Sequence, residues 1–311
     1  MIDRISFFLE EKVQYLSDRF LGIRFKLGNA DIGYLGQIQI QKHHGGLYIS
    51  CSLPKLIYGE NITVMPRKTV KEAVWKLEDM LNVDLSCVSL TSMEIGVSII
   101  VAEHPSRYMR LFGNHPRYPR APYTDSKGHM SVRYAKVKGN FSFQAYDKKA
   151  EMKDKKVKED GMPSIFQGSN VLRLEAKIKR RKGIQRLFGM DLSPHDLYKP
   201  DVYEELKRYF WKFYSDISKT DQAVFFDMGE GSLTPKRFEE LLAKQYCQSN
   251  PEDCLAFIAE CKAKGSVSRD SYSRIKGTLR PVVPSTGKKG SFNHKLIEEL
   301  YAKVWDWVKT G

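Results

Sequence analysis

The chain has 311 residues, enough for one large domain or two smaller ones with a hydrophobic core. Hydrophobic residues make up 41% and charged residues 28%, and no run of about 18 apolar residues exists, so we expect a soluble globular protein without a membrane span. Lys and Arg total 51 against 37 Asp and Glu, which gives a net charge of +14. This charge favours a protein that binds a polyanion, most often nucleic acid, over a soluble enzyme that is basic without such a partner.

The N-terminal segment and the cysteines indicate a cytoplasmic setting. Met1–Lys12 carries acidic residues and no long apolar core, so we do not expect a signal peptide. The chain has five cysteines without a close CxxC pair, and an odd number with no export signal fits a reducing cytoplasm. Cys247, Cys254 and Cys261 are evenly spaced, which favours a buried helical stripe over a metal site.

Strand and helix patterns alternate up to about Gly189. Leu35–Gln41 and Leu47–Leu53 alternate apolar and polar residues around HHGG, which predicts a hairpin. Thr69–Leu81 has apolar residues at helical spacing. Further strands are predicted at Ser92–Val101, Ser131–Val137, Asn140–Tyr146 and Val171–Lys179, and His104–Gly128, rich in Pro, Gly and Arg, is predicted to be a long basic surface loop.

From about Asp191 the pattern becomes helical. Helices are predicted at Asp201–Ile217, Thr234–Gln245, Pro251–Lys262, Arg269–Leu279 and Phe292–Lys309, with a linker at Pro281–Gly290. The pair around Gly265 has the outline of a helix-turn-helix, an outline shared by any two short helices around a glycine. We therefore expect a first domain over residues 1–190 and a mainly helical region over 191–311 that binds DNA or a partner.

Three of the predicted strands carry one apolar and one polar face. This predicts an α+β fold, an antiparallel sheet with helices on one face. If the strands are neighbours, Glu94, Tyr146 and Glu175 share the open face, and Glu151 follows at the end of the tyrosine strand.

These residues allow two interpretations. Carboxylates are ligands for Mg²⁺ or Mn²⁺. A tyrosine, with a free pKa of about 10, becomes a nucleophile when a cation such as the metal, Lys148 or Lys149 stabilises its phenolate. The same pattern also fits a packed tyrosine beside an exposed ladder of ion pairs. The pattern alone leaves both open.

The same segments resemble the rolling-circle replication initiators of filamentous phages, the gene II protein family, and related plasmid initiators. VLRLEAKIK, Val171–Lys179, is similar to the family's R-[FL]-E-A-[RK]-I-K strand, and AYDKKAE, Ala145–Glu151, to its A-Y-x-K-x-x-E segment. SLPKLIYGEN, Ser52–Asn61, and the opening Met1-Ile2-Asp3 also resemble the family. The resemblance covers most of the first 200 residues and only loosely the last third.

The resemblance implies a site-specific DNA nicking and joining enzyme. Tyr146 would attack one phosphodiester at a replication origin, leaving a 5′-phosphotyrosine and a free 3′-OH for a host polymerase, with a host helicase as a further partner. Glu175 and Glu151 would be associated with a divalent metal, Mg²⁺ or Mn²⁺. The family has R-I-D where this chain has Ser92-Met93-Glu94. We therefore expect Glu94 to be a metal ligand whose side chain is longer than that of the family's aspartate.

Other rolling-circle enzymes bind metal through a His-hydrophobic-His pair. The adjacent His43 and His44 would point to opposite faces of a sheet, so we interpret them as a hairpin feature.

Basic residues around the proposed site are expected to bind origin DNA, both duplex and single-stranded. They are Arg107, Arg110, Arg117 and Arg120, which are interleaved with tyrosines, and Arg173, Lys177, Lys179, Arg180 and Arg181. Two alternatives stay open: a relaxase of a mobile element with the same chemistry, and a non-catalytic origin-binding initiator.

Overall fold

The computed structural model describes residues 2–10, 32–43, 45–124, 130–155, 163–219 and 292–310, with scattered residues between 259 and 273. The chain separates into two compact units, Met1–Lys219 with Leu296–Gly311, and Thr220–Lys295. The sheet and the helices around it belong to the first unit. Within the described residues, no helix is both long and apolar enough to cross a membrane.

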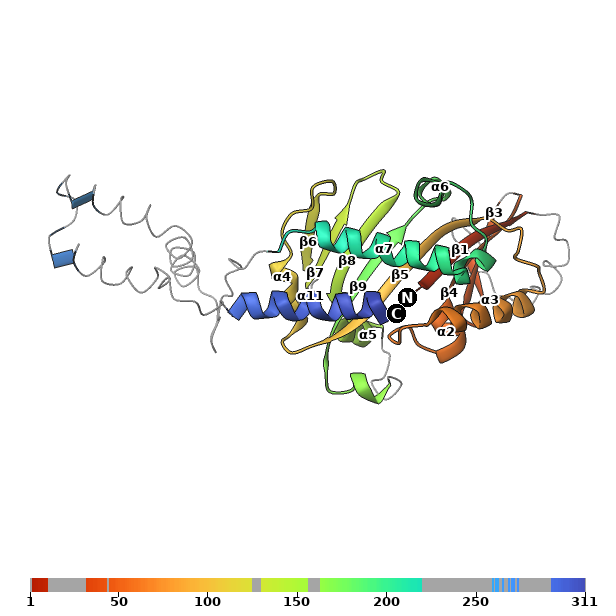
Figure 1. Ribbon diagram of the computed structural model, residues 1–311, viewed down its shortest axis with the longest axis horizontal. Helices are drawn as coiled ribbons and strands as arrows, with labels where there is room; N and C mark the ends of the chain where they lie inside the picture. The colour runs from red at the N-terminus through yellow and green to blue at the C-terminus, as the bar shows by residue number, and fades with distance from the viewer. Residues whose placement is uncertain are drawn as a thin grey trace. The chain divides into compact units, whose positions relative to one another are not determined.

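A nine-stranded sheet forms the centre of this unit, and all of its strand pairs are antiparallel (Figure 1). The strand order is β2-β3-β4-β1-β5-β9-β8-β7-β6. The strands are β1 (Ile2–Glu10), β2 (Ile32–Leu35), β3 (Ile38–His43), β4 (Gly46–Ser52), β5 (Leu90–Val101), β6 (Arg120–Thr124), β7 (Met130–Ala135), β8 (Phe141–Asp147) and β9 (Asn170–Ile178).

The described helices lie between the strands and after them. They are α2 (Leu53–Tyr58), α3 (Arg67–Leu81), α4 (Pro105–Leu111), α5 (Lys148–Asp154), η3 (Ser164–Phe166), α6 (Arg181–Phe188), η4 (Pro194–Tyr198), α7 (Pro200–Asp216) and α11 (Phe292–Thr310). The α+β fold class predicted from the strand patterns is confirmed.

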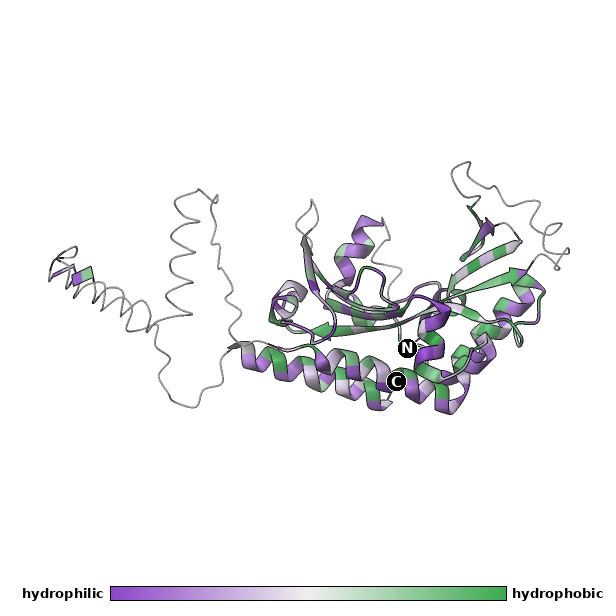
Figure 2. Ribbon diagram, turned by 90° about the horizontal axis from the view of Figure 1, so that it is seen from above, coloured by the Kyte–Doolittle hydropathy of each residue, from purple (hydrophilic) through white to green (hydrophobic). Residues whose placement is uncertain are grey.

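Helix α7 covers the apolar face of the sheet. Its Phe210 and Phe213 pack on Phe143 of β8, with ring centroids 5.7 and 5.4 Å apart. All three rings are buried, because alternate residues of β8 point to this face. Figure 2 shows hydrophobic and hydrophilic residues alternating along the strands and along the helices against the sheet.

Helix α11 runs beside α7 (Figure 1). Its Leu296, Leu300, Val304 and Trp307 are buried, and Trp307 meets Phe210 edge to face at 4.8 Å. The hydroxyl of Tyr108 on α4 donates a hydrogen bond to Glu299. The last helix of the chain is therefore a core element of the first unit, and the contacts do not divide the chain at residue 190.

One short helix lies on the opposite, polar face. Met152 of α5 packs with Ile62 and with Val171, which is on the same side of β9 as Arg173. Helices α7 and α11 thus cover one face of the sheet, and the short helix α5 borders the other.

Several element predictions are confirmed, and others are wrong. The hairpin forms as β3 and β4, and Thr69–Leu81 lies within α3. His104–Gly128 is not one loop, because it contains α4 and β6. β1 was missed because its nine residues are largely buried on both sides and so do not alternate. The helices predicted at Thr234–Gln245, Pro251–Lys262 and Arg269–Leu279, and the cysteine stripe, lie mostly outside the described residues.

The packing of α11 predicts a loss of stability when its buried face is truncated. Leu300→Ala should lower the free energy of unfolding by about 2–5 kcal/mol, because the removed side chain leaves a cavity in a packed interface. Urea unfolding of the full chain measures this value. Lys295→Ala, at an exposed position of the same helix, is the control and should change it by less than about 0.5 kcal/mol. Equal effects of the two changes would contradict the core role of α11.

Candidate active site

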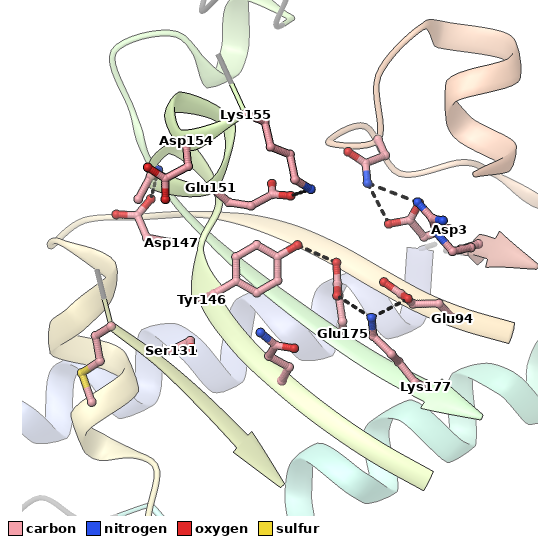
Figure 3. A pocket seen from close by; sticks show the side chains of 15 residues that line it. Asp3, Glu94, Ser131, Tyr146, Asp147, Glu151, Asp154, Lys155, Glu175 and Lys177 are labelled. Carbon is pink, nitrogen blue, oxygen red and sulfur yellow. Dashed lines mark hydrogen bonds and ion pairs between the residues drawn. The ribbon is translucent and has the colours of Figure 1, made fainter. Parts of the chain in front are cut away.

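The polar face of the sheet carries a pocket of about 600 Å³. It lies over β1, β5, β9 and β8 and is bordered by α5 (Figure 3). Its lining residues are Asp3, Arg4, Asn61, Glu94, Met130, Ser131, Gln144, Tyr146, Asp147, Ala150, Glu151, Asp154, Lys155, Glu175 and Lys177.

Beneath the pocket lies the guanidinium of Arg173, which is only 2% exposed. It forms ion pairs with Asp3 and, through Nε at 3.2 Å, with Glu175, and it donates a 3.0 Å hydrogen bond to Ser98. Burial lowers the pKa of Arg173, but the carboxylates of Asp3 and Glu175 raise it further, so the net shift is upward. The side chain is therefore a permanent buried cation that fixes two carboxylates.

Gly96 makes room for this guanidinium. A Cβ atom at Gly96 would lie 2.1 Å from Nη2 and 2.6 Å from Cζ of Arg173. Gly96 is paired with Glu175 in the sheet, so Arg173 and Glu175 approach β5 where it has no side chain. Glycine is required here for close approach, as expected where another group packs against a strand.

Asp3 reaches the pocket because β1 is irregular at that point. Ile2 pairs with Ile95 and Arg4 with Glu94, so Asp3 is an extra residue between two consecutive pairs. Such a bulge re-aims a side chain. The carboxylate of Asp3 accepts hydrogen bonds from Ser52 at 2.8 Å and from Asn61 at 3.0 Å, besides its ion pair with Arg173.

Three carboxylates converge in the pocket. Asp3, Glu94 and Glu175 each offer an oxygen, and these oxygens lie within 4.8 Å of one another. Lys177 pairs with Glu94 at 2.7 Å and lies 3.8 Å from Glu175. The three carboxylates come from β1, β5 and β9, three adjacent central strands.

The ionisation of this group fits a bound cation. Burial, and then repulsion from Glu175, raises the pKa of Glu94. Burial also acts to raise the pKa of Glu175, but the guanidinium of Arg173 and other partners lower it overall. Oxygen ligands of this kind suit Mg²⁺ or Mn²⁺, and a divalent cation would relieve the repulsion between the two glutamates. The donor set therefore fits the expected hard metal.

Tyr146 points toward these carboxylates (Figure 3). Its hydroxyl donates a 2.6 Å hydrogen bond to Oε1 of Glu175. Burial, and then the negative charge of Glu175, raises the pKa of Tyr146 well above its ordinary value. Both causes favour the neutral phenol, and positive charge placed near Glu175 would favour the phenolate.

Glu151 lines the same pocket but is held by lysines. It pairs with Lys148 at 2.8 Å and with Lys155, and these partners, acting against burial, lower its pKa overall. Lys148 is only 2% exposed and also donates to Asn61 at 3.0 Å. Glu151 is thus absent from the group of three carboxylates within 4.8 Å, and Asp3 takes the place expected for it.

Helix α5 begins directly after the tyrosine strand. Asp147 caps it by accepting hydrogen bonds from the backbone N–H groups of Lys149 and Ala150. The cap fixes the direction of α5 and therefore the positions of Lys148 and Glu151 relative to Tyr146. Lys149 does not line the pocket.

The residues expected to bind DNA lie on several elements of the first unit. Arg173 is a correction, because its burial leaves no surface for a DNA contact. Lys177 lines the pocket, while Lys179 and Arg180 follow at the end of β9. Arg181 pairs through two nitrogens with Asp191. Arg107 and Arg110 lie on α4. Arg117 lies in the segment between α4 and β6, and Arg120 is the first residue of β6.

Asp3 and Asn61 are the site residues that sequence reasoning missed. Both lie within segments that resemble the phage initiators, the opening Met1-Ile2-Asp3 and the stretch Ser52–Asn61. That likeness was the available signal, because no strand periodicity marks either residue as facing the pocket.

A second group of potential ligands lies elsewhere in the first unit. Glu78, Asp84 and His195 offer atoms within 4.8 Å of one another, and His195 Nε2 lies 2.6 Å from Oε1 of Glu78. None of the three lines the pocket of Tyr146.

Comparison with known proteins gives a limited result. No protein-family model matches the chain, and no curated protein matches it. Among solved structures, it is similar to a rolling-circle replication initiator protein from Geobacillus stearothermophilus, with 11% identity and a TM-score of 0.38. The match covers 79% of this chain and 96% of that one. A likeness this distant says nothing about the activity of this chain.

The contact between Gly96 and Arg173 predicts a strong effect of one methyl group. Gly96→Ala should lower the free energy of unfolding by at least about 1–3 kcal/mol, because Arg173 is held by three partners and cannot move aside without breaking them. Urea unfolding measures the change. Gly139→Ala is the control and should have the smaller effect, since the three atoms nearest its Cβ all belong to Lys136 in the same turn, at 3.0 Å or more. An unchanged stability of Gly96→Ala would contradict the close approach.

Proposed function

We propose that this chain is a metal-dependent DNA nicking and joining enzyme with Tyr146 as its nucleophile. The supporting observation is the 2.6 Å hydrogen bond between Tyr146 and Glu175, within a group of three carboxylates on the open face of the sheet. A strongly basic chain, with a net charge of +14, fits a nucleic acid substrate.

Each site residue has a role in this proposal. Asp3, Glu94 and Glu175 would hold a divalent metal, and Arg173 keeps Asp3 and Glu175 in place. Such a metal would supply positive charge that polarises the scissile phosphate and offsets negative charge in the transition state. Lys148 does not line the pocket but donates hydrogen bonds of 3.0 and 2.8 Å to two residues that do, Asn61 and Glu151, and so positions both.

The reaction is a transesterification at phosphorus. The phenol oxygen of Tyr146 forms a bond to the phosphorus atom, its proton leaves, and the bond from phosphorus to the 3′ oxygen breaks. The 3′ oxygen takes up a proton, so the products are a 5′-phosphotyrosine and a free 3′-OH. Attack by a 3′-OH on the phosphotyrosine reverses the step and rejoins a strand. The number of phosphodiester-type bonds is conserved, and no external energy source is required.

The biological setting that suits this chemistry is rolling-circle replication. The free 3′-OH primes synthesis by a host polymerase, a host helicase opens the duplex, and the second transesterification closes a circle. A relaxase of a mobile element uses the same chemistry and is the nearest alternative. In a non-catalytic origin-binding initiator, the carboxylates would serve only Arg173 and Lys177.

Removal of the tyrosine hydroxyl separates catalysis from binding. With Mg²⁺ and a supercoiled plasmid that carries the cognate origin, the wild-type protein should nick the plasmid and remain covalently attached. Tyr146→Phe should lower nicking by more than about 10³-fold, because it lacks the attacking oxygen. Gel electrophoresis and mass spectrometry of the adduct measure both events. Tyr48→Phe, on β4, is the control. A covalent adduct on a residue other than Tyr146 would reject the assignment.

Loss of one carboxylate should separate catalysis from DNA affinity. Glu175→Gln should reduce nicking by about 10²–10³-fold, the range for loss of one group that stabilises the transition state. Affinity for duplex DNA should change little, because it depends mainly on Lys and Arg. Chelation of divalent ions by EDTA should abolish nicking by the wild-type protein. Full activity of Glu175→Gln, or nicking in EDTA, would contradict the metal site.

A further inference from the structure

A second pocket lies on the apolar side of the sheet and plays no part in the proposed chemistry. Its volume is about 190 Å³. It lies between α6, α7, the start of β8 and the segment before β6, all within the first unit. Its lining residues are His115, Arg117, Tyr118, Phe141, Arg186, Leu187, Tyr209, Lys212, Phe213 and Asp216.

Aromatic rings form much of the wall of this pocket. Tyr118 stacks on Phe213 with ring centroids 4.8 Å apart and an angle of 24° between the ring planes. Phe141 lies 5.6 Å from Tyr209, and His115 lies 4.9 Å from Tyr118. Pockets for drug-sized ligands have volumes of roughly 300–1,000 Å³. This pocket is smaller, and its size suits a single planar ring system.

Tyr209 contributes its ring to the wall of the pocket. Its hydroxyl is buried, closed off from solvent, and without a hydrogen-bond partner among the described residues. The pocket therefore offers a ligand the aromatic surface of Tyr209 and not its hydroxyl.

The rim of the pocket is positively charged. Arg117, Arg186 and Lys212 stand against one carboxylate, Asp216, which lies 3.6 Å from Lys212. Arg117 and Arg186 are exposed and have no ion pair among the described residues. Aromatic walls with a cationic rim match the two parts of a nucleotide, since bases stack on aromatic rings and phosphates attract arginine.

We propose that this pocket binds an unpaired base of the DNA strand on which the protein acts. The base stacks against Tyr118, and Arg117 and Arg186 contact the flanking phosphates. The inference rests on the proposed function for its choice of ligand. It assigns a base-binding site that is separate from the pocket of Tyr146.

Strand β8 connects the two pockets. Phe141 at its start faces the new pocket, and Tyr146 near its end faces the carboxylates on the other side of the sheet. Five residues of strand correspond to a distance of about 17 Å. A bound strand therefore has to pass around the end of the sheet to occupy both pockets.

Basic side chains line this route. Lys177 lies in the first pocket, and Lys179 and Arg180 follow it toward the end of β9. Lys136, in the exposed turn between β7 and β8, lies 6.0 Å from the ring centroid of Tyr118. Phosphates between the two pockets would therefore pass near these four positive charges.

The proposal is tested by fluorescence anisotropy with a labelled single-stranded 12-mer and the full chain carrying Tyr146→Phe, so that binding is measured without cleavage. Tyr118→Ala should weaken binding by about 5- to 100-fold, the effect of losing one base–aromatic stack. An abasic site at the matching position of the 12-mer should weaken binding to the parent by a similar factor. In Tyr118→Ala the same abasic site should have no further effect.

Tyr209→Phe is a matched control in the same wall, because it keeps the ring and removes only a hydroxyl that is closed off from solvent. Since this hydroxyl has no partner among the described residues, its removal should leave the melting temperature unchanged or raised. Affinity for the 12-mer should stay within about twofold of the parent. A loss of affinity in Tyr209→Phe as large as that in Tyr118→Ala would contradict binding by base stacking on Tyr118.

Controls and competing ligands complete the test. Trp75→Ala, on an exposed aromatic of α3, should leave affinity within about twofold of the parent. If pocket variants and abasic sites leave strand affinity unchanged, the proposal is rejected. If a free mononucleotide competes as strongly as the unlabelled 12-mer, the pocket binds single nucleotides, and the proposal that it binds a base of a DNA strand is rejected. If the wild-type protein does not nick DNA but its binding to the 12-mer still depends on the base, only the proposed nuclease function is rejected.

Discussion

The buried guanidinium of Arg173 is the constraint on which the polar face of this protein depends. A charge removed from water is tolerated only when partners compensate it, and loss of one partner of a buried pair typically costs about 3–5 kcal/mol. Arg173 has Asp3, Glu175 and Ser98 as partners, and Gly96 gives it space. Two of the three converging carboxylates are thus held in place by the fold itself, and their positions do not depend on a bound ion.

The two faces of the sheet differ: one packs against helices, and the other carries the candidate site. On one face, α7 and α11 bury aromatic and aliphatic side chains, and on the other, carboxylates from β1, β5 and β9 share a pocket with Tyr146. The central strands place these groups on rigid backbone with neighbours on both sides. A site built on such strands is held more precisely than one on loops.

The alternation of β5, β8 and β9 was sufficient to place Glu94, Tyr146 and Glu175 on one face, because side-chain direction in a strand follows position. Asp3 was not predictable in this way, since it depends on a bulge in a strand whose burial hides any alternation. Arg173 was misjudged because a charged residue on a polar face is ordinarily exposed. Its burial follows from Gly96 across the strand pair, and pairing between distant strands cannot be derived from local periodicity.

The distance along the chain between the members of the site has a consequence for folding. Asp3 and Arg173 are 170 positions apart, and their contact exists only after β1, β5 and β9 have paired. Contacts of such long range form late, and a chain emerging from the ribosome must be synthesised past β9 before they can form. A nascent or truncated polypeptide that ends before β9 therefore lacks the assembled carboxylate cluster, and the candidate site exists only in a chain that has been made past this strand.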